Sequence, residues 1–397
     1  MKSLSLIQNK KLPLIIGSSL VFALSACQPP TDKAASSDTP KADTQSTTEH
    51  SSQPLAEAKT PKALTKALVE LSEKTLKEQL ICTKLDDTIN AIDNKSEIEN
   101  IYAVQHQLSA CLPLADNTQT LQWLTEYQAM YQRFLSVNST NSINNVNSAT
   151  DNRALYALMR TIEQDQKITV AQLKEVSPRV RYLVSLIRSD SDVHVRYLGE
   201  GDYEFSHDLT AMADIFIPYL PEDQAAFVQR MATDNQGIFW FDAALAFSFE
   251  ELIERTVFWE DFIKHYPQSI FYNDAKALFN TYRYLLFFGS ENTQWTDKEV
   301  RNFYDSDNKR LMLSLAKRTD SELAKNVQDF FTFMAQSDTE RLTQYPIPDK
   351  NKNGGEIDER NITPYQLNKA LDIPSPWHTT ENRNCLTGII CVDDNTQ

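Results

Sequence analysis

The stretch FYNDAKALFNTYRYLLFF, residues 271–288, decides the fold class. Its apolar residues recur at steps of three and four, so they form one stripe along a helix. The sequence therefore predicts an all-α chain, an array of antiparallel helical hairpins or an irregular helical bundle. Similar stripes run through Leu64 to Leu80, Leu121 to Phe134, Val170 to Ile187, Leu209 to Leu220, Phe249 to Phe262 and Leu323 to Phe333.

One segment, residues 193–205, departs from the helical pattern. Val193, Val195 and Tyr197 alternate with polar residues and precede a turn that contains Gly199 and Gly201. This alternation is typical of a short β-hairpin. A long connection between two helices is the alternative.

Just before the deciding helix, the chain reads FIKHYPQSIFYNDA, residues 262–275. This segment resembles the joint between helices in tetratricopeptide-type repeats of periplasmic proteins, including outer-membrane assembly lipoproteins. Pro267 would end one helix and Ser269 would cap the next. The resemblance implies helical hairpins, although no second copy follows at the 34-residue period of that family.

Changes in composition divide the chain into six parts. A signal peptide, residues 1–26, precedes a tether, 27–61, which is poor in large apolar side chains. A first helical region, 62–135, is separated by an Asn- and Ser-rich loop, 136–152, from the main helical domain, 153–345. We expect the remaining residues, 346–397, to form an extended tail with a small disulfide loop.

The residues Leu24-Ser25-Ala26-Cys27 follow a basic start and an apolar run that is too short to span a bilayer. They resemble the lipobox of bacterial lipoproteins. The resemblance implies cleavage before Cys27, attachment of lipid to its thiol, and anchoring in a membrane without a transmembrane helix. Gln28 follows the cysteine and favours the outer membrane, on its periplasmic face, by the sorting logic of that family, while surface display stays open.

Four further cysteines lie in what we expect to be an oxidising compartment, and an even number predicts two disulfides. Ser96 opens an expected capping box, with Cys82 fourteen residues before it and Cys111 fifteen after it. In two antiparallel helices that share this turn, both cysteines lie at the same level. We therefore predict a Cys82–Cys111 disulfide, and by elimination a Cys385–Cys391 disulfide.

The net charge of −15 and the scarcity of glycine exclude several function classes. An acidic surface repels phosphate backbones, so we expect no nucleic-acid partner. The chain has only eight glycines and no GxxxxGK[ST] motif, which argues against nucleotide binding. We expect no cofactor.

Several local motifs resemble ligand sites without meeting their full requirements. His194, His207 and Asp208 lie near Glu200, Asp202 and Glu204 but lack the helical spacing of zinc ligands. Asp349 to Gly354 begins like an EF-hand loop, yet Arg360 stands where a bidentate glutamate is needed and Glu359 comes one residue early. We expect no metal site.

The remaining candidates concern catalysis and an apolar groove. Ser314 and Lys317 match a penicillin-binding motif, but the second motif, Ser306-Asp307-Asn308, comes in the wrong order. Acid pairs such as Glu250-Glu251 and Glu260-Asp261 are expected to be solvated. An aromatic group belongs to a buried core or, alternatively, lines a groove for a peptide or apolar ligand: Phe239, Trp240, Phe241, Phe247, Phe249, Phe258, Trp259 and Phe262.

These observations favour a membrane-tethered helical interaction or scaffold module of the cell envelope, with protein partners there and no catalytic residues. An envelope hydrolase with scattered acids and a carrier of a small apolar ligand are the alternatives.

Overall fold

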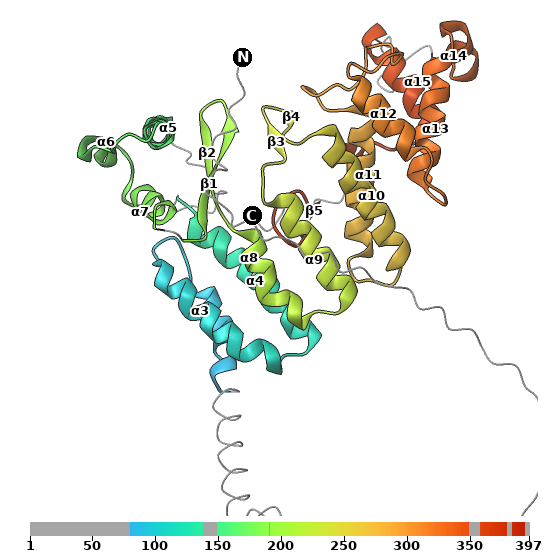
Figure 1. Ribbon diagram of the computed structural model, residues 1–397. Helices are drawn as coiled ribbons and strands as arrows, with labels where there is room; N and C mark the ends of the chain where they lie inside the picture. Colours follow the sequence, from blue (N-terminus) through green and yellow to red (C-terminus); the bar gives the residue numbers. More distant parts are fainter. Residues whose placement is uncertain (1–79, 138–148, 190, 349–357, 379–382, 394–397) are drawn as a thin grey trace, which may run out of the picture. The chain divides into compact units, whose positions relative to one another are not determined.

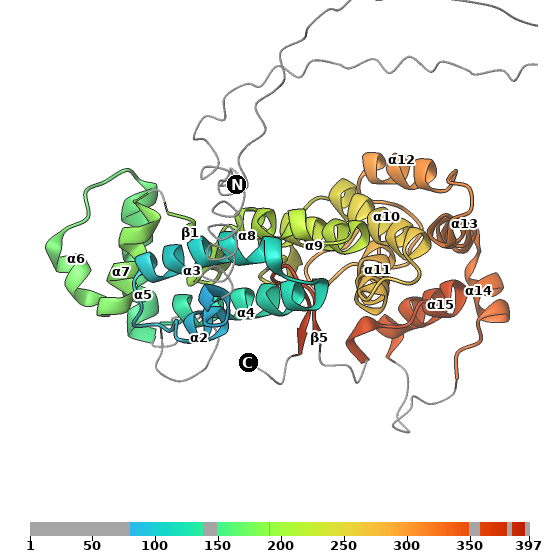
Figure 2. The same ribbon diagram turned by 90° about the horizontal axis from the view of Figure 1, so that it is seen from below.

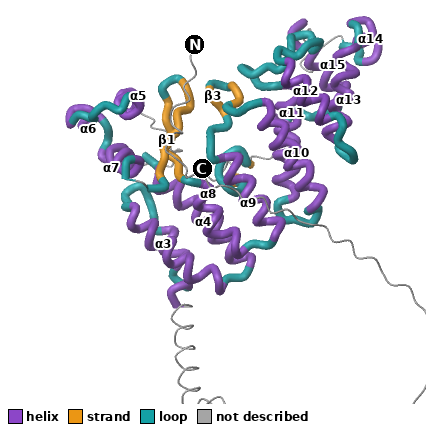
Figure 3. Tube along the Cα trace, viewed as in Figure 1, coloured by secondary structure: helices purple, strands orange, loops and turns teal. Residues whose placement is uncertain are grey.

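The computed structural model describes residues 80–137, 149–189, 191–348, 358–378 and 383–393. Helices dominate these residues, and three short antiparallel strand pairs accompany them (Figures 1 and 3). The N-terminal part contains α2 (Leu85–Asn90), α3 (Ile98–Cys111), α4 (Asn117–Leu135), α5 (Ala149–Glu163), α6 (Val170–Glu175), α7 (Pro178–Ile187), β1 (Val193–Gly199) and β2 (Asp202–His207).

Two helical hairpins and the C-terminal elements follow. These are α8 (Leu209–Phe216), α9 (Glu222–Asn235), β3 (Trp240–Phe241), β4 (Ala244–Leu245), α10 (Phe249–His265), α11 (Tyr272–Phe288), α12 (Ser306–Leu315), α13 (Glu322–Ala335), α14 (Asp338–Gln344), α15 (Ile362–Leu371), the 3-10 turn η4 (Pro376–His378), β5 (Arg383–Asn384) and β6 (Val392–Asp393). The predicted helical class is confirmed. Within the described ranges no helix has the length and apolar character required to cross a bilayer.

The predicted β-hairpin is also confirmed, because β1 pairs with β2 in antiparallel register from Val193 opposite His207. Glu200 and Gly201 form the turn, and both have positive φ. Phe205 on β2 is fully buried, and Val193 on β1 is nearly so. The hairpin thus contributes one apolar face to the core.

Many helices begin after a residue whose side chain caps the helix, and the type of this residue can be recognised in the sequence. Asp116, Ser177 and Ser248 each accept a hydrogen bond from the backbone N–H three residues later. The expected cap at Ser96 is wrong by one residue. Glu97 is the N-cap of α3, its N–H donates to the Asn100 side chain at 2.9 Å, and the Ser96 hydroxyl accepts from the N–H of Asp93.

The structure brings Cys82 and Cys111 to disulfide distance, with Cα atoms 5.5 Å apart, as predicted. Cys82 lies in a helical turn that ends before α2, so the long helix expected before Ser96 is interrupted at residues 83–84. Figure 2 shows α2, α3 and α4 side by side. The disulfide ties the start of this group to the end of α3.

α10 ends before Pro267, as the sequence suggests, but Ser269 does not have the expected role at the start of α11. α10 ends at His265, directly before Tyr266 and Pro267. Ser269 does not cap α11, since that helix begins at Tyr272 and the Ser269 hydroxyl instead accepts from the N–H of Phe271. Serine therefore shapes the turn rather than the helix end.

Arginines from other elements satisfy the carbonyls at several helix C-termini. Arg133 donates to Ile89 O at 2.8 Å and to Ile92 O at 3.0 Å at the end of α2. The same arrangement recurs at the ends of α9 and α13, where Arg196 and Arg341 are the donors. In a chain with so few glycines, these guanidinium groups take the role that a left-handed glycine cap often has.

The C-terminal segment is only partly extended, which corrects the expectation of an extended tail. Residues Ile362–Leu371 form α15, whose Leu367 and Leu371 are buried, and α15 packs on α13. Pro364 lies in the first turn of this helix, where a missing N–H has no cost.

α5 likewise starts at Ala149, inside the stretch expected as a loop.

The Cys385–Cys391 pair, with Cα atoms 4.3 Å apart, closes a small hairpin that is built into the core. Gln128 of α4 accepts from Ile389 N at 2.6 Å and from Ile390 N at 3.2 Å. Asn235 of α9 donates to Gly388 O at 2.8 Å. The end of the described chain thus joins two helices that are distant in sequence.

Candidate functional site

The aromatic residues between 239 and 262 divide between the core and the surface. Phe239, Phe249, Trp259 and Phe262 are buried, and Phe247 and Phe258 pack against the core. Trp240 is only half-buried, and it lies on β3 at the edge of this cluster. One aromatic side chain therefore reaches an accessible cleft.

A tight turn with unusual backbone angles presents Trp240. Asp242 and Ala243, which join β3 to β4, have φ values of 51° and 55°. Two consecutive positive values are typical of a type I′ hairpin turn, which normally contains Asn or Gly. Alanine in this conformation carries strain, so the surrounding structure must hold the turn.

The loop after α11 supplies that support. The Ser290 hydroxyl donates to Ala243 O at 2.9 Å, and the Asn292 amide donates to Asp242 O at 2.5 Å. Gly289 ends α11 with φ 69° and ψ −157°, a region that is essentially restricted to glycine. A β-carbon there would lie 2.2 Å from Thr293 O. The close approach of the loop after α11 to the β3–β4 hairpin thus depends on Gly289.

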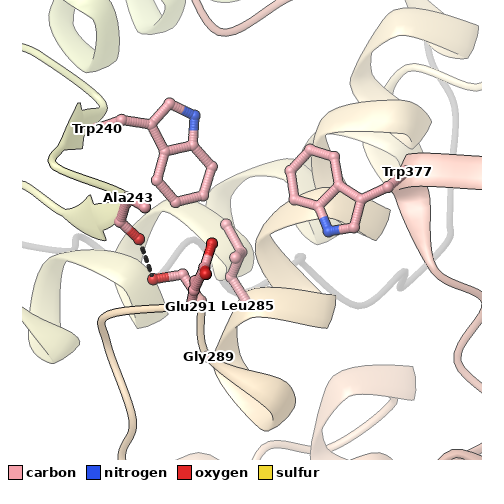
Figure 4. A pocket seen from close by; sticks show the side chains of 7 residues that line it. Trp240, Ala243, Leu285, Gly289, Glu291 and Trp377 are labelled. Atoms are coloured by element: carbon pink, nitrogen blue, oxygen red, sulfur yellow. Dashed lines mark hydrogen bonds between the residues drawn. The ribbon is translucent and has the colours of Figure 1, made fainter.

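A cleft of about 380 Å³ lies between the β3–β4 hairpin, the end of α11 and η4. The indole rings of Trp240 and Trp377 both face it, and Leu285 and Glu291 also line it (Figure 4). The two ring centroids are 6.1 Å apart and the ring planes are inclined at 56°. The remaining lining residues are Ala243, Gly289 and Ser290.

The charge of the cleft is negative. Glu291 is exposed and, within the described residues, has no ion-pair or hydrogen-bond partner. The C-terminal end of α11 adds the negative end of a helix dipole, and no basic residue occupies the last turn of that helix. Two electron-rich indole faces and a carboxylate together favour a cation.

Sequence reasoning found Trp240 but missed Trp377, Gly289 and Glu291. Trp377 is 51% exposed and was hidden in the proline-containing tail, yet a large apolar side chain in a polar segment was a usable signal. Nothing local marks Glu291 among the many acids of this chain. The cleft combines three segments that lie far apart in the sequence.

His207, considered as a zinc ligand, is buried at the end of β2. Its ring stacks on Tyr131 of α4 with centroids 3.9 Å apart, and the Tyr131 hydroxyl donates to Asp192. His194, by contrast, is exposed. Burial, and then the charges of Arg196 and His194, lower the pKa of His207 to about 3.

This depressed pKa predicts that stability is lost as the pH falls. An unfolded histidine binds a proton near pH 6.5, whereas folded His207 stays neutral down to about pH 3. The free energy of unfolding should therefore fall by up to about 1.4 kcal/mol per pH unit below pH 6.5 because of this residue. Urea unfolding of wild type and His207→Phe at pH 7.5 and 4.5 measures the difference.

Burial also raises the pKa of Asp192 and of Glu204, and these carboxyl groups make the free energy of unfolding rise as the pH falls. The contribution of His207 is therefore measured as the difference between wild type and the variant. We expect the loss of stability between the two pH values to be smaller in His207→Phe by about 2–3 kcal/mol. His106→Gln, which replaces an exposed histidine on α3, serves as the matched control and should behave as wild type. Equal pH dependence in all three proteins would contradict the prediction.

One group of potential metal ligands exists among the described residues, and it does not fit a metal. Asp274, Cys385 and Cys391 offer ligand atoms within 4.8 Å of one another. Both cysteines are in the disulfide, and Arg383 binds both oxygens of Asp274 at 2.9 Å. The structure does not bring His194, His207 and the neighbouring acids into such a group.

The expected solvation of the acid pairs is wrong for one pair. Glu260 is buried, and it accepts from the Ser321 hydroxyl and from Leu323 N at the start of α13. Asp261 receives two hydrogen bonds from Arg318, at 2.7 and 2.9 Å. A carboxylate on one helix can thus be buried where it caps another helix that is distant in sequence.

The other motifs gain no support as a site. Ser306, Asp307 and Asn308 open α12, while Ser314 lies near its end and is exposed. The lipid-attachment residue Cys27 and the EF-hand-like turn from Asp349 to Gly354 lie outside the described residues.

No family model matches this chain, and no curated protein or solved structure was found to be similar to it.

Proposed function

We propose that the protein is a lipid-tethered interaction module of the cell envelope that recognises its partner through the cleft between Trp240 and Trp377. The observation that carries the proposal is the cleft itself, in which two tryptophans from distant segments converge on one accessible space. Tryptophan is enriched among the residues that dominate binding energy at protein interfaces. A strained turn, held by Ser290 and Asn292, fixes one of the two rings.

Location is the second part of the proposal. Lipid on Cys27 would hold the protein at the outer membrane on its periplasmic face, with residues 28–61 as a flexible spacer. The tetratricopeptide-like arrangement suggested by residues 262–275 also remains a proposal, and the recognition function does not depend on it.

The cleft favours binding over catalysis. Glu291 is the single titratable side chain in its lining, whereas acid–base chemistry usually needs groups with distinct roles. A carrier of a small apolar ligand is a second candidate, favoured by Leu285 and the two indole rings. The two candidates differ in whether a protein occupies the cleft.

The anchor predicts that Cys27→Ala, exported behind a secretory signal peptide that is cleaved without lipidation, releases the protein into the soluble periplasmic fraction. Without the thiol no lipid can be attached, and no helix of the described part can replace the anchor. Immunoblotting of fractionated cells measures this, with Cys27 wild type as the reference. Retention of the variant in the membrane fraction would show that the tether is not a lipid on Cys27.

Recognition through the cleft is tested by photo-cross-linking in the cells that make the protein. A photoreactive amino acid at Trp377 should give discrete adducts with envelope proteins, and Trp240→Ala should remove them. The same amino acid at Tyr304, which is 67% exposed and does not line the cleft, is the matched control. Identical products from both positions, or none from Trp377, would refute the proposed function. A small-molecule adduct alone would favour the carrier.

A further inference from the structure

We infer that the cleft receives the arginine side chain of a partner protein. This inference rests on the proposed function, because it specifies the chemistry of the group that the interaction module recognises. It follows from the geometry of the cleft, from contacts that recur elsewhere in this chain, and from the positions of the chain's own arginines.

The geometry suits a flat cation. The rings of Trp240 and Trp377 are inclined at 56° with centroids 6.1 Å apart, so a group that lies in the cleft beside this ring pair can be within about 6 Å of both centroids. Glu291 at the rim can accept hydrogen bonds from such a group (Figure 4). The end of α11 contributes a negative potential at the same side.

The chain itself uses the same combination of groups several times. Arg255 lies 4.1 Å from the centroid of the Phe247 ring and is bound to Glu251 at 2.6 Å. Arg230 lies 4.8 Å from the Phe258 ring centroid and pairs with Glu254 at 3.2 Å. In each case an aromatic face and a carboxylate hold one guanidinium. The cleft has two aromatic faces and a carboxylate, and no guanidinium among the described residues fills it.

Arginine fits this environment better than lysine. The guanidinium is planar, weakly hydrated and able to stack on aromatic rings, whereas the ammonium of lysine is compact and strongly hydrated. Leu285 and the indole faces offer no acceptors to replace that hydration. Arginine is also enriched with tryptophan in the energetically dominant part of interfaces.

The sequence favours a partner as the source of this arginine. No arginine precedes Arg133, so the N-terminal 132 residues cannot provide one. The undescribed internal stretches 138–148, 349–357 and 379–382 contain none either, and Arg360 is the one arginine whose side chain lies outside the described part. The net charge of −15 further favours a cationic partner.

The experiment titrates the intact protein with N-acetyl-arginine amide and observes the indole N–H signals by NMR. The signals of Trp240 and Trp377, assigned with single Trp→Phe variants, should shift together, and that of the fully buried Trp259 should not. N-acetyl-citrulline amide, a neutral isostere, should bind at least about tenfold more weakly. N-acetyl-lysine amide should also bind more weakly than the arginine probe.

Glu291→Gln is the decisive variant, and Glu250→Gln is its matched control because both remove one exposed negative charge. We expect Glu291→Gln to weaken arginine binding several-fold and Glu250→Gln to leave it unchanged. Equal binding of citrulline, or equal effects of the two variants, would overturn the inference. If cross-links from position 377 persist in that case, the proposed function stands and only the arginine assignment fails. Tighter binding of the lysine probe would assign the cleft to a lysine.

Discussion

Gly289→Ala should lower the free energy of unfolding by about 3–5 kcal/mol and abolish binding at the cleft. The added β-carbon would lie 2.2 Å from Thr293 O, a backbone atom that cannot swing away. The backbone angles at Gly289 add a conformational cost of about 1–3 kcal/mol for any other residue. Relief of the overlap would displace Ser290 and Asn292, which hold the hairpin that carries Trp240. Urea denaturation and titration with the arginine probe measure the two effects.

Gly201→Ala separates the two causes. Gly201 also has a positive φ, of 94°, but nothing lies within 4 Å of the position of its added β-carbon. We expect this variant to lose only the conformational part, about 1–2 kcal/mol, and to bind normally. Equal losses in both variants would mean that contact with Thr293 is unimportant.

Arg255→Met should cost about 3–5 kcal/mol, because it leaves a buried charge without one of its partners. Arg255 lies among Asp234, Glu251 and Tyr282, and it is 4% exposed. Asp234 is 5% exposed and would keep only Arg230, at 2.9 Å. Thermal and urea unfolding report the loss.

Arg310→Met is the control for this effect. Arg310 pairs with Asp307 at 3.3 Å, but both side chains are 72% exposed, so its replacement should cost at most about 1 kcal/mol. A double variant, Arg255→Met with Asp234→Asn, should recover part of the loss since it removes the stranded charge. No recovery would indicate that the packing of Arg255 on Phe247 matters more than its charge.

The features that could be predicted from the sequence are local ones. The helical stripe at 271–288, the hairpin at 193–205 and the pairing of Cys82 with Cys111 each depend on residues close in the chain or on a shared turn. The errors had several causes. Some were small shifts of a helix boundary, as at Ser96, where neighbouring polar residues compete for the same cap. Others, as at Glu260, arose because a distant helix start provides the partner.

The cleft could not be predicted for a physical reason. Trp240, Leu285, Glu291 and Trp377 come together only after α11 has packed beside the hairpin and the C-terminal segment has returned to α11. Such convergence leaves no periodic pattern in the sequence. The strained turn at Ala243 gives no local signal either, because alanine is an uncommon residue for it.

The arginines at the helix C-termini have a consequence for how the protein opens. A glycine cap is formed by the residues of the helix end itself, so that end can fray and reform alone. Here the ends of α2, α9 and α13 are closed by Arg133, Arg196 and Arg341, which belong to α4, β1 and α14. Opening one of these helix ends therefore also breaks the hydrogen bonds of an arginine that belongs to a second element. We expect the backbone amides of the two elements to exchange their hydrogens together, as one cooperative unit.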